Sequence, residues 1–187
     1  MDVFEYVAVM VTVVLALAVS HILTSLATMI ANPERVRPYW VHFLWAVLLL
    51  GLNLQAWLVL WTLRGQSEWP VGQIVMMLTS ASLIFVAARV LEPELPPGAC
   101  VDLRDHFSRV RFPLFATLSV FWLFPIVGRL VFVGGHMLEP ATIGRFAFLG
   151  LSLSGVIVKS PTWHAMLAIV WVGLLIATVA FVRGELA

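Results

Sequence analysis

Charged side chains are scarce in this sequence. Aspartate, glutamate, lysine and arginine together make up 11% of the 187 residues, whereas hydrophobic residues make up 61% and the mean hydropathy is +1.01. A soluble globular domain carries roughly 25% charged residues. A chain of this size exposes too much surface for a buried core to absorb so many apolar residues. The composition therefore excludes a water-soluble domain and predicts that lipid solvates most of the chain.

Cysteine is almost absent as well. Cys100 is the only one, which excludes an internal disulfide and any metal or iron–sulfur site built from several cysteines. The net charge is only +1, so the composition does not indicate a nucleic-acid partner.

Several catalytic motifs are missing. The sequence contains no glycine-rich phosphate loop, no HExxH zinc motif and no nucleophile elbow. No lysine lies inside a long apolar segment, so a retinal Schiff base has no attachment point, and no carboxylate lies at the centre of such a segment. A relay of protons through carboxylates at helix centres is therefore not expected. The absence of these motifs favours a protein that is not an enzyme, although it does not exclude catalysis.

Long apolar segments dominate what is present. Five windows, 6–33, 38–63, 69–88, 112–138 and 160–182, carry at most one charged residue each. A bilayer core of about 30 Å needs roughly 20 apolar residues as a helix. Open strands are excluded because an unpaired sheet edge cannot lie in hydrocarbon. A sixth window, 141–158, becomes long enough if Arg145 extends its side chain to the membrane surface.

We therefore predict an all-α, polytopic integral membrane protein that forms a single domain over residues 1–187. Its six expected transmembrane helices span approximately 3–30, 39–63, 70–91, 107–133, 141–158 and 162–182. The alternative is five crossings and a re-entrant segment at 141–158.

The distribution of basic residues predicts the orientation. Seven arginine or lysine residues lie in or beside the first, third and fifth loops: Arg35, Arg37, Arg89, Arg104, Arg109, Arg111 and Lys159. Four lie on the other side: Arg64, Arg129, Arg145 and Arg183. Cytoplasmic loops carry the excess of positive charge. We expect a cell inner (plasma) membrane protein with an external N-terminus and a cytoplasmic loop at 92–106. A model with five crossings gives the same ratio, so charge does not decide whether 141–158 crosses.

Glycines and small residues predict close helix packing. Gly150 and Ser154 have the small-xxx-small spacing, and we expect their face to pack against another helix. Gly51 is expected to let the first two helices approach each other.

A polar stripe interrupts the first apolar segment. In SHILTSLATMI, residues 20–30, the side chains of His21, Thr24, Ser25 and Thr28 recur at helical spacing on one face. By the helical rise, His21 should lie near the bilayer midplane, opposite Asn53 or Gln55 of the second helix. These six residues are the predicted ligand or ion pathway. The competing interpretation is that they only hydrogen-bond helices to one another.

The remaining histidines suggest weaker alternatives. His42 and His164 share a layer near the cytoplasmic surface and are the candidates for a haem, whose two axial imidazoles must lie at one depth. Ser154 could also meet His164 as a catalytic dyad, but no oxyanion site accompanies it. We expect neither a cofactor nor a metal.

Three functions remain open from the sequence. The first is a homo-oligomeric channel or transporter for an ion or small solute. The second is a non-catalytic accessory or assembly subunit of a larger membrane complex, and the third is a redox subunit that binds haem or quinone. The lipid bilayer is the one partner common to all three.

Overall fold

The computed structural model describes residues 3–96, 98–128, 130 and 140–186, with side chains except at 140–141 and 179–186. These residues form six long helices: α1 (Val3–Ala31), α2 (Trp40–Thr62), α3 (Val71–Leu91), α4 (Leu103–Gly128), α5 (Pro140–Ile157) and α6 (Pro161–Leu186). The prediction of an all-α, polytopic membrane protein is confirmed.

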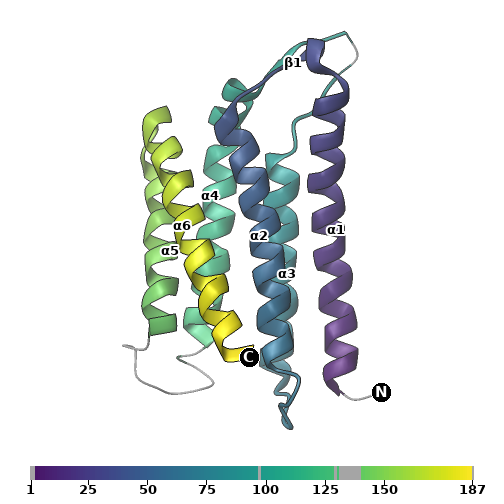
Figure 1. Ribbon diagram of the computed structural model, residues 1–187, viewed down its shortest axis with the longest axis vertical. Helices are drawn as coiled ribbons and strands as arrows, with labels where there is room; N and C mark the ends of the chain where they lie inside the picture. Colours follow the sequence, from purple (N-terminus) through teal and green to yellow (C-terminus); the bar gives the residue numbers. More distant parts are fainter. Residues whose placement is uncertain (1–2, 97, 129, 131–139, 187) are drawn as a thin grey trace.

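Five of the six helices contain apolar stretches long enough to cross a membrane. The sixth, α5, has 18 residues and runs beside α4 as one uninterrupted helix (Figure 1). It is continuous within these bounds, and whether it crosses the bilayer as the sixth span stays a prediction. Proline begins both α5 and α6, at the position where its missing N–H has no helical partner to lose.

Helix α4 begins earlier than the expected residue 107. Its first residue is Leu103, because the side chain of Asp102 caps it. The Oδ1 atom of Asp102 accepts hydrogen bonds from the backbone N–H groups of Arg104, at 2.8 Å, and Asp105, at 3.4 Å. The described residues of α4 run to Gly128, and residues 129 and 131–133 of the expected span lie outside the described residues.

Successive helices alternate in direction (Figure 1). One end of the bundle holds the start of α1, the α2–α3 connection and the end of α6. The opposite end holds the α1–α2 connection, the α3–α4 connection and the α5–α6 turn (Figure 1). We call this second end the loop-rich end.

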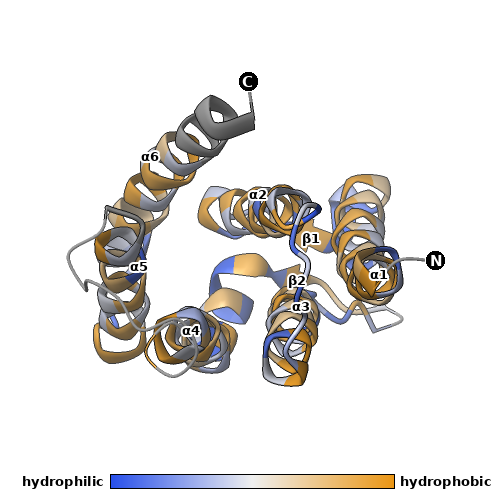
Figure 2. Ribbon diagram, turned by 90° about the horizontal axis from the view of Figure 1, so that it is seen from below, coloured by the Kyte–Doolittle hydropathy of each residue, from blue (hydrophilic) through white to orange (hydrophobic). Residues whose placement is uncertain are grey.

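Seen end-on, α2, α3, α4, α5 and α6 form a ring, and α1 packs outside it against α2 and α3 (Figure 2). Hydrophobic residues make up most of each helix (Figure 2). Aromatic side chains fill the ring: Trp45 lies 4.9 Å from Phe115 and 5.3 Å from Trp171, between ring centroids, and Trp122 stacks on Phe148 at 4.3 Å. The centre of the bundle is thus a packed aromatic core.

A short ladder joins two connections at the loop-rich end. After the 3-10 turn η1 (Pro33–Arg35), strand β1 (Val36–Arg37) pairs in parallel with β2 (Val101–Asp102). An Nη2 atom of Arg35 donates to the carbonyls of Leu95, at 3.3 Å, and Pro96, at 2.6 Å. The α1–α2 connection therefore holds the α3–α4 connection in place.

The expected packing of the glycines needs correction. Gly150 is exposed, and a Cβ added there meets nothing within 4 Å, so Gly150 itself does not pack on another described residue. The buried glycine of α5 is Gly155, where an added Cβ would lie 2.6 Å from the ring of Phe115. Gly51 faces Leu175 of α6 and not α1. Small residues reveal close contacts, but their spacing does not identify the neighbouring helix.

Candidate functional site

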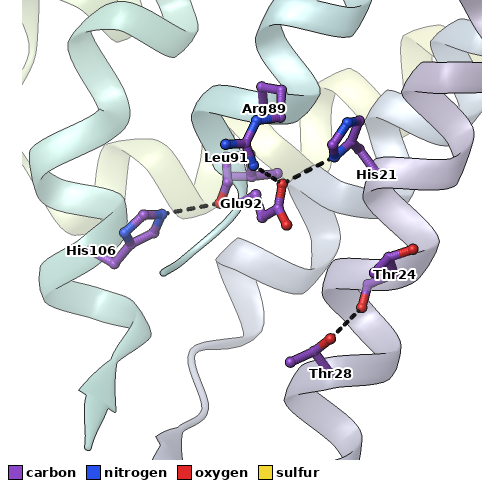
Figure 3. A network of polar contacts seen from close by, with 7 residues as sticks. All are labelled: His21, Thr24, Thr28, Arg89, Leu91, Glu92 and His106. Carbon is purple, nitrogen blue, oxygen red and sulfur yellow. Dashed lines mark hydrogen bonds and ion pairs between the residues drawn. The ribbon is translucent and has the colours of Figure 1, made fainter. Parts of the chain in front are cut away.

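The end of α3 is where polar side chains of three helices meet. Pro93 disfavours helical backbone at the residue before it, and Glu92 accordingly has an extended conformation, with ψ at 121°. Helix α1 continues past this point towards Ala31. The carboxylate of Glu92 therefore lies against the side of α1, level with His21 (Figure 3).

The carboxylate of Glu92 contacts two side chains, those of His21 and Arg89. Its Oε2 atom lies 3.3 Å from Nδ1 of His21 and also receives a close hydrogen bond from Nη1 of Arg89 (Figure 3). Because a carboxylate only accepts, Nδ1 of His21 carries the hydrogen in this contact. The ring of Phe85 stands edge-on to His21 at 5.3 Å between centroids. When His21 is protonated, the contact becomes an ion pair shared by α1 and α3.

The hydrogen-bond partner of His21 differs from the one expected, whereas its depth in the bilayer stays a prediction. His21 was expected near the bilayer midplane with a partner on the second helix. Its partner is instead Glu92, the first residue after α3, so His21 lies level with the end of a neighbouring helix. Sequence reasoning missed this because the depth of His21 was counted only along its own helix.

A cleft of about 400 Å³ opens beside this contact. It lies between α1 and the connection that follows α3, and we call it the first cleft. Its lining residues are Ser25, Thr28, Arg89, Glu92, Pro93, Glu94, Leu95 and Pro96. Two of the predicted pathway residues, Ser25 and Thr28, thus lie where the prediction requires a polar lining.

The other predicted pathway residues lie elsewhere. Thr24 is exposed, and its backbone carbonyl accepts the hydroxyl of Thr28 at 2.8 Å. Asn53 is buried in α2 and donates to the Leu49 carbonyl of its own helix at 2.9 Å. Asn53 Oδ1 and Gln55 Oε1 are buried with no hydrogen-bond partner among the described residues. His21 contacts Glu92 and Asn53 bonds its own helix, so their hydrogen bonds do not connect the two residues.

A second cleft, of about 630 Å³, lies on the other side of the same connection. It shares Arg89, Glu92, Glu94 and Pro96 with the first cleft, and β2 and the start of α4 complete it. His106 lies in its wall and bonds the Leu91 carbonyl through Nε2 at 3.0 Å (Figure 3). Leu91 and Glu92 are consecutive, so the end of α3 holds one histidine on each side.

His42 and His164 are both buried at the loop-rich end, but they are enclosed by rings of the same chain. His42 lies 5.7 Å from His106, and His164 lies 5.7 Å from Phe107 and 5.2 Å from Phe115, between centroids. At these distances the rings are in contact. Each of the two imidazoles therefore packs directly against rings of its own chain, and a haem held by this pair stays a prediction.

The hydrogen bonds of Ser154 do not include His164, its partner in the catalytic dyad considered as a weak alternative. Its hydroxyl donates to the Leu151 carbonyl at 2.7 Å and accepts from the indole N–H of Trp163 at 3.3 Å. The hydroxyl of Ser154 therefore links the start of α6 to α5.

Sequence analysis missed Arg89 and Glu92 as site residues. Arg89 was counted only as a basic residue beside the loop, and Glu92 was assigned to the first position of the loop because it precedes proline. The available signal was the difference in length between neighbouring helices: α1 has 29 residues and α3 has 21, so polar residues after the shorter helix lie beside the longer one.

No group of three or more histidine, cysteine, aspartate or glutamate residues with metal-binding geometry occurs among the residues that the structure describes. The contacting groups at the first cleft are the carboxylate of Glu92, the guanidinium of Arg89 and the imidazole of His21, with a second carboxylate, Glu94, in the lining. No protein-family model, curated protein or solved structure matches the chain.

Proposed function

We propose that the chain is a channel or transporter for an ion or small solute, with the contact between His21, Glu92 and Arg89 as its polar centre. The observation that carries this proposal is the distance of 3.3 Å between His21 Nδ1 and Glu92 Oε2 at a cleft that is also lined by Ser25 and Thr28. Ionisable groups among the helices of membrane proteins are costly and commonly mark pathways for ions or substrates.

The chemistry of this centre suits reversible binding. Glu92 can exchange its contacts with His21 and Arg89 for a bound cation or polar solute. A cleft of about 400 Å³ exceeds by roughly tenfold the 30 Å³ that one water molecule occupies in the liquid. A hydrated ion or a small metabolite therefore fits.

Homo-oligomerisation belongs to the same proposal. The packed aromatic core leaves no wide passage through the centre of one protomer, so a continuous pathway would run along α1 and α3. A second copy could close this side and complete the pathway. Placement in the inner membrane with an external N-terminus also remains a proposal, based on the distribution of arginine and lysine.

The test is flux through proteoliposomes that contain the purified protein. Wild type is compared with His21→Ala, His21→Phe and Glu92→Gln, using a panel of small cations, anions and neutral solutes between pH 5 and 8. Each variant should lower the flux of the transported species at least about tenfold, as expected when a group that contacts the solute is lost.

Ser20→Ala is the matched control, because Ser20 is exposed on α1 next to His21 and does not line the cleft. It should behave as wild type. Folded variants at positions 21 and 92 with wild-type flux throughout the pH range would contradict the proposal.

A non-catalytic accessory subunit is the second candidate. The ordered loop-rich end, with its β1–β2 ladder and the bonds from Arg35, offers a rigid surface for docking a partner. A chain that conducts nothing in liposomes and is stable only when expressed with other membrane subunits would favour this role.

A further inference from the structure

A buried histidine lies next to the second cleft, and the polar centre described above does not use it. His42 in α2 is only 1% exposed. Its Nδ1 atom has no hydrogen-bond partner among the described residues. A buried polar atom without a partner costs free energy, so it requires an explanation, such as a bound water or a functional role.

The neighbour of His42 connects it to the cleft. The rings of His42 and His106 are 5.7 Å apart between centroids, edge to face. His106 lies in the wall of the second cleft. The Leu91 carbonyl can only accept, so Nε2 of His106 carries a hydrogen and Nδ1 is the atom that can take up a proton.

The charges of the second cleft favour cations. Its ionised lining comprises four carboxylates and two guanidinium groups: Glu92, Glu94, Asp102, Asp105, Arg89 and Arg109. A recess lined by an excess of one charge sign raises the local concentration of the opposite ion. Hydronium is thus concentrated where His106 meets the solvent.

We propose that the second cleft, His106 and His42 form a proton-access route into the bundle. Hydronium in the cleft transfers a proton to Nδ1 of His106, while Nε2–H remains bonded to the Leu91 carbonyl. His106 then passes a proton through one bridging water molecule to Nδ1 of His42. The reverse steps return it to the cleft, so no electron is transferred and no bond other than N–H and O–H changes.

This route goes beyond the proposed function because it uses α2 and α4, whereas the His21 centre uses α1 and α3. The titratable and charged groups around it are those of the cleft lining, together with Tyr39, whose ring packs on Phe107, and Arg104, which lies near Tyr39. Burial raises the pKa of Tyr39, so this phenol stays neutral near pH 7.

Hydrogen–deuterium exchange at the C2 positions of the histidine rings tests the route in the full-length protein, read out by mass spectrometry in lipid nanodiscs. His164 is the internal control, because it is 2% exposed at the same end of the bundle but packs against Phe107 and Phe115. His42 should exchange several-fold faster than His164. In His106→Phe, the exchange of His42 should fall to the rate of His164.

A second measurement avoids substitution in the core. Cys100 lines the second cleft and is exposed, so a bulky maleimide attached there should close the entrance and slow the exchange of His42. The same reagent should have no effect on Cys100→Ser. Equal exchange of His42 and His164, or exchange of His42 that the maleimide leaves unchanged, would overturn the route. Neither result depends on flux through the His21 centre, so the two proposals can fail separately.

Discussion

Among single residues, Glu92 has the largest effect on the arrangement of the site, although its contacts are energetically modest. The side chains of Glu92, Arg89 and His21 are 21%, 49% and 37% exposed. Ion pairs with this degree of exposure contribute about 0–1 kcal/mol to stability, because solvent screens them. Glu92 therefore adds little to stability, and its main role is to position His21 and Arg89 at the first cleft.

Replacing Glu92 with glutamine should accordingly separate stability from function. We expect the free energy of unfolding in detergent to fall by less than about 1 kcal/mol, since one screened contact is lost. Flux in liposomes should nevertheless fall strongly. Chemical unfolding measured beside the transport assay checks this, and a loss of several kcal/mol would mean that Glu92 is a structural residue.

Two of the glycines of α5, Gly150 and Gly155, provide a second test at the residue scale. In Gly155→Ala, the new methyl group would lie 2.6–2.8 Å from ring atoms of Phe115, and the rigid ring can move only by disturbing its own packing. We expect destabilisation of about 1–3 kcal/mol, as for other overpacked cores.

Gly150→Ala is the matched control on the same helix. Its methyl group would meet open space, and alanine favours helix, so thermal unfolding should be unchanged or slightly higher. If both alanine variants melted together, the observed contact between α4 and α5 would be wrong.

At the scale of elements, the segment between α3 and α4 is restrained from outside. Two carbonyls of this segment accept hydrogen bonds from Arg35, and the β1–β2 ladder holds its end. Both clefts share residues of this segment. A change in its position would therefore alter both clefts together.

Arg35→Ala should loosen this segment without unfolding the bundle. Hydrogen bonds from a charged donor contribute about 1.5–3 kcal/mol, so their loss should raise amide exchange across residues 93–102 several-fold. Arg37→Ala is the control, because Arg37 is exposed in β1. Backbone hydrogen–deuterium exchange measured by mass spectrometry distinguishes them, and equal exchange in the two variants would show that Arg35 does not restrain the connection.

For the whole molecule, the central question is which end of the bundle faces the cytoplasm. Cys100 lies at the loop-rich end, and Ser67 lies in the α2–α3 connection at the opposite end (Figure 1). Both residues are exposed. A bilayer across the bundle places them on different sides.

Labelling intact cells with a membrane-impermeant thiol reagent should therefore separate the two positions. Native Cys100 should remain unlabelled until the membrane is permeabilised, whereas Ser67→Cys in a Cys100→Ala background should be labelled at once. This result follows from the excess of basic residues at the loop-rich end. The opposite pattern would reverse the orientation, and labelling of both positions in intact cells would contradict the transmembrane arrangement.

The sequence alone determined the class of the protein, its helices and part of its polar lining. Long apolar windows predict helices because backbone N–H and C=O groups in lipid must be satisfied within the segment. Ser25 and Thr28 were found because helical spacing places them on the face of His21.

Tertiary structure alone decided which residues of different helices meet. The relative height of α1 and α3 brings Glu92 to His21, and this offset depends on the lengths of two helices and the path between them. Gly51 and Gly155 face partners on other helices that their own spacing does not reveal. Periodicity describes one helix at a time, whereas contacts between helices depend on relative rotation and axial position, which only the packed bundle determines.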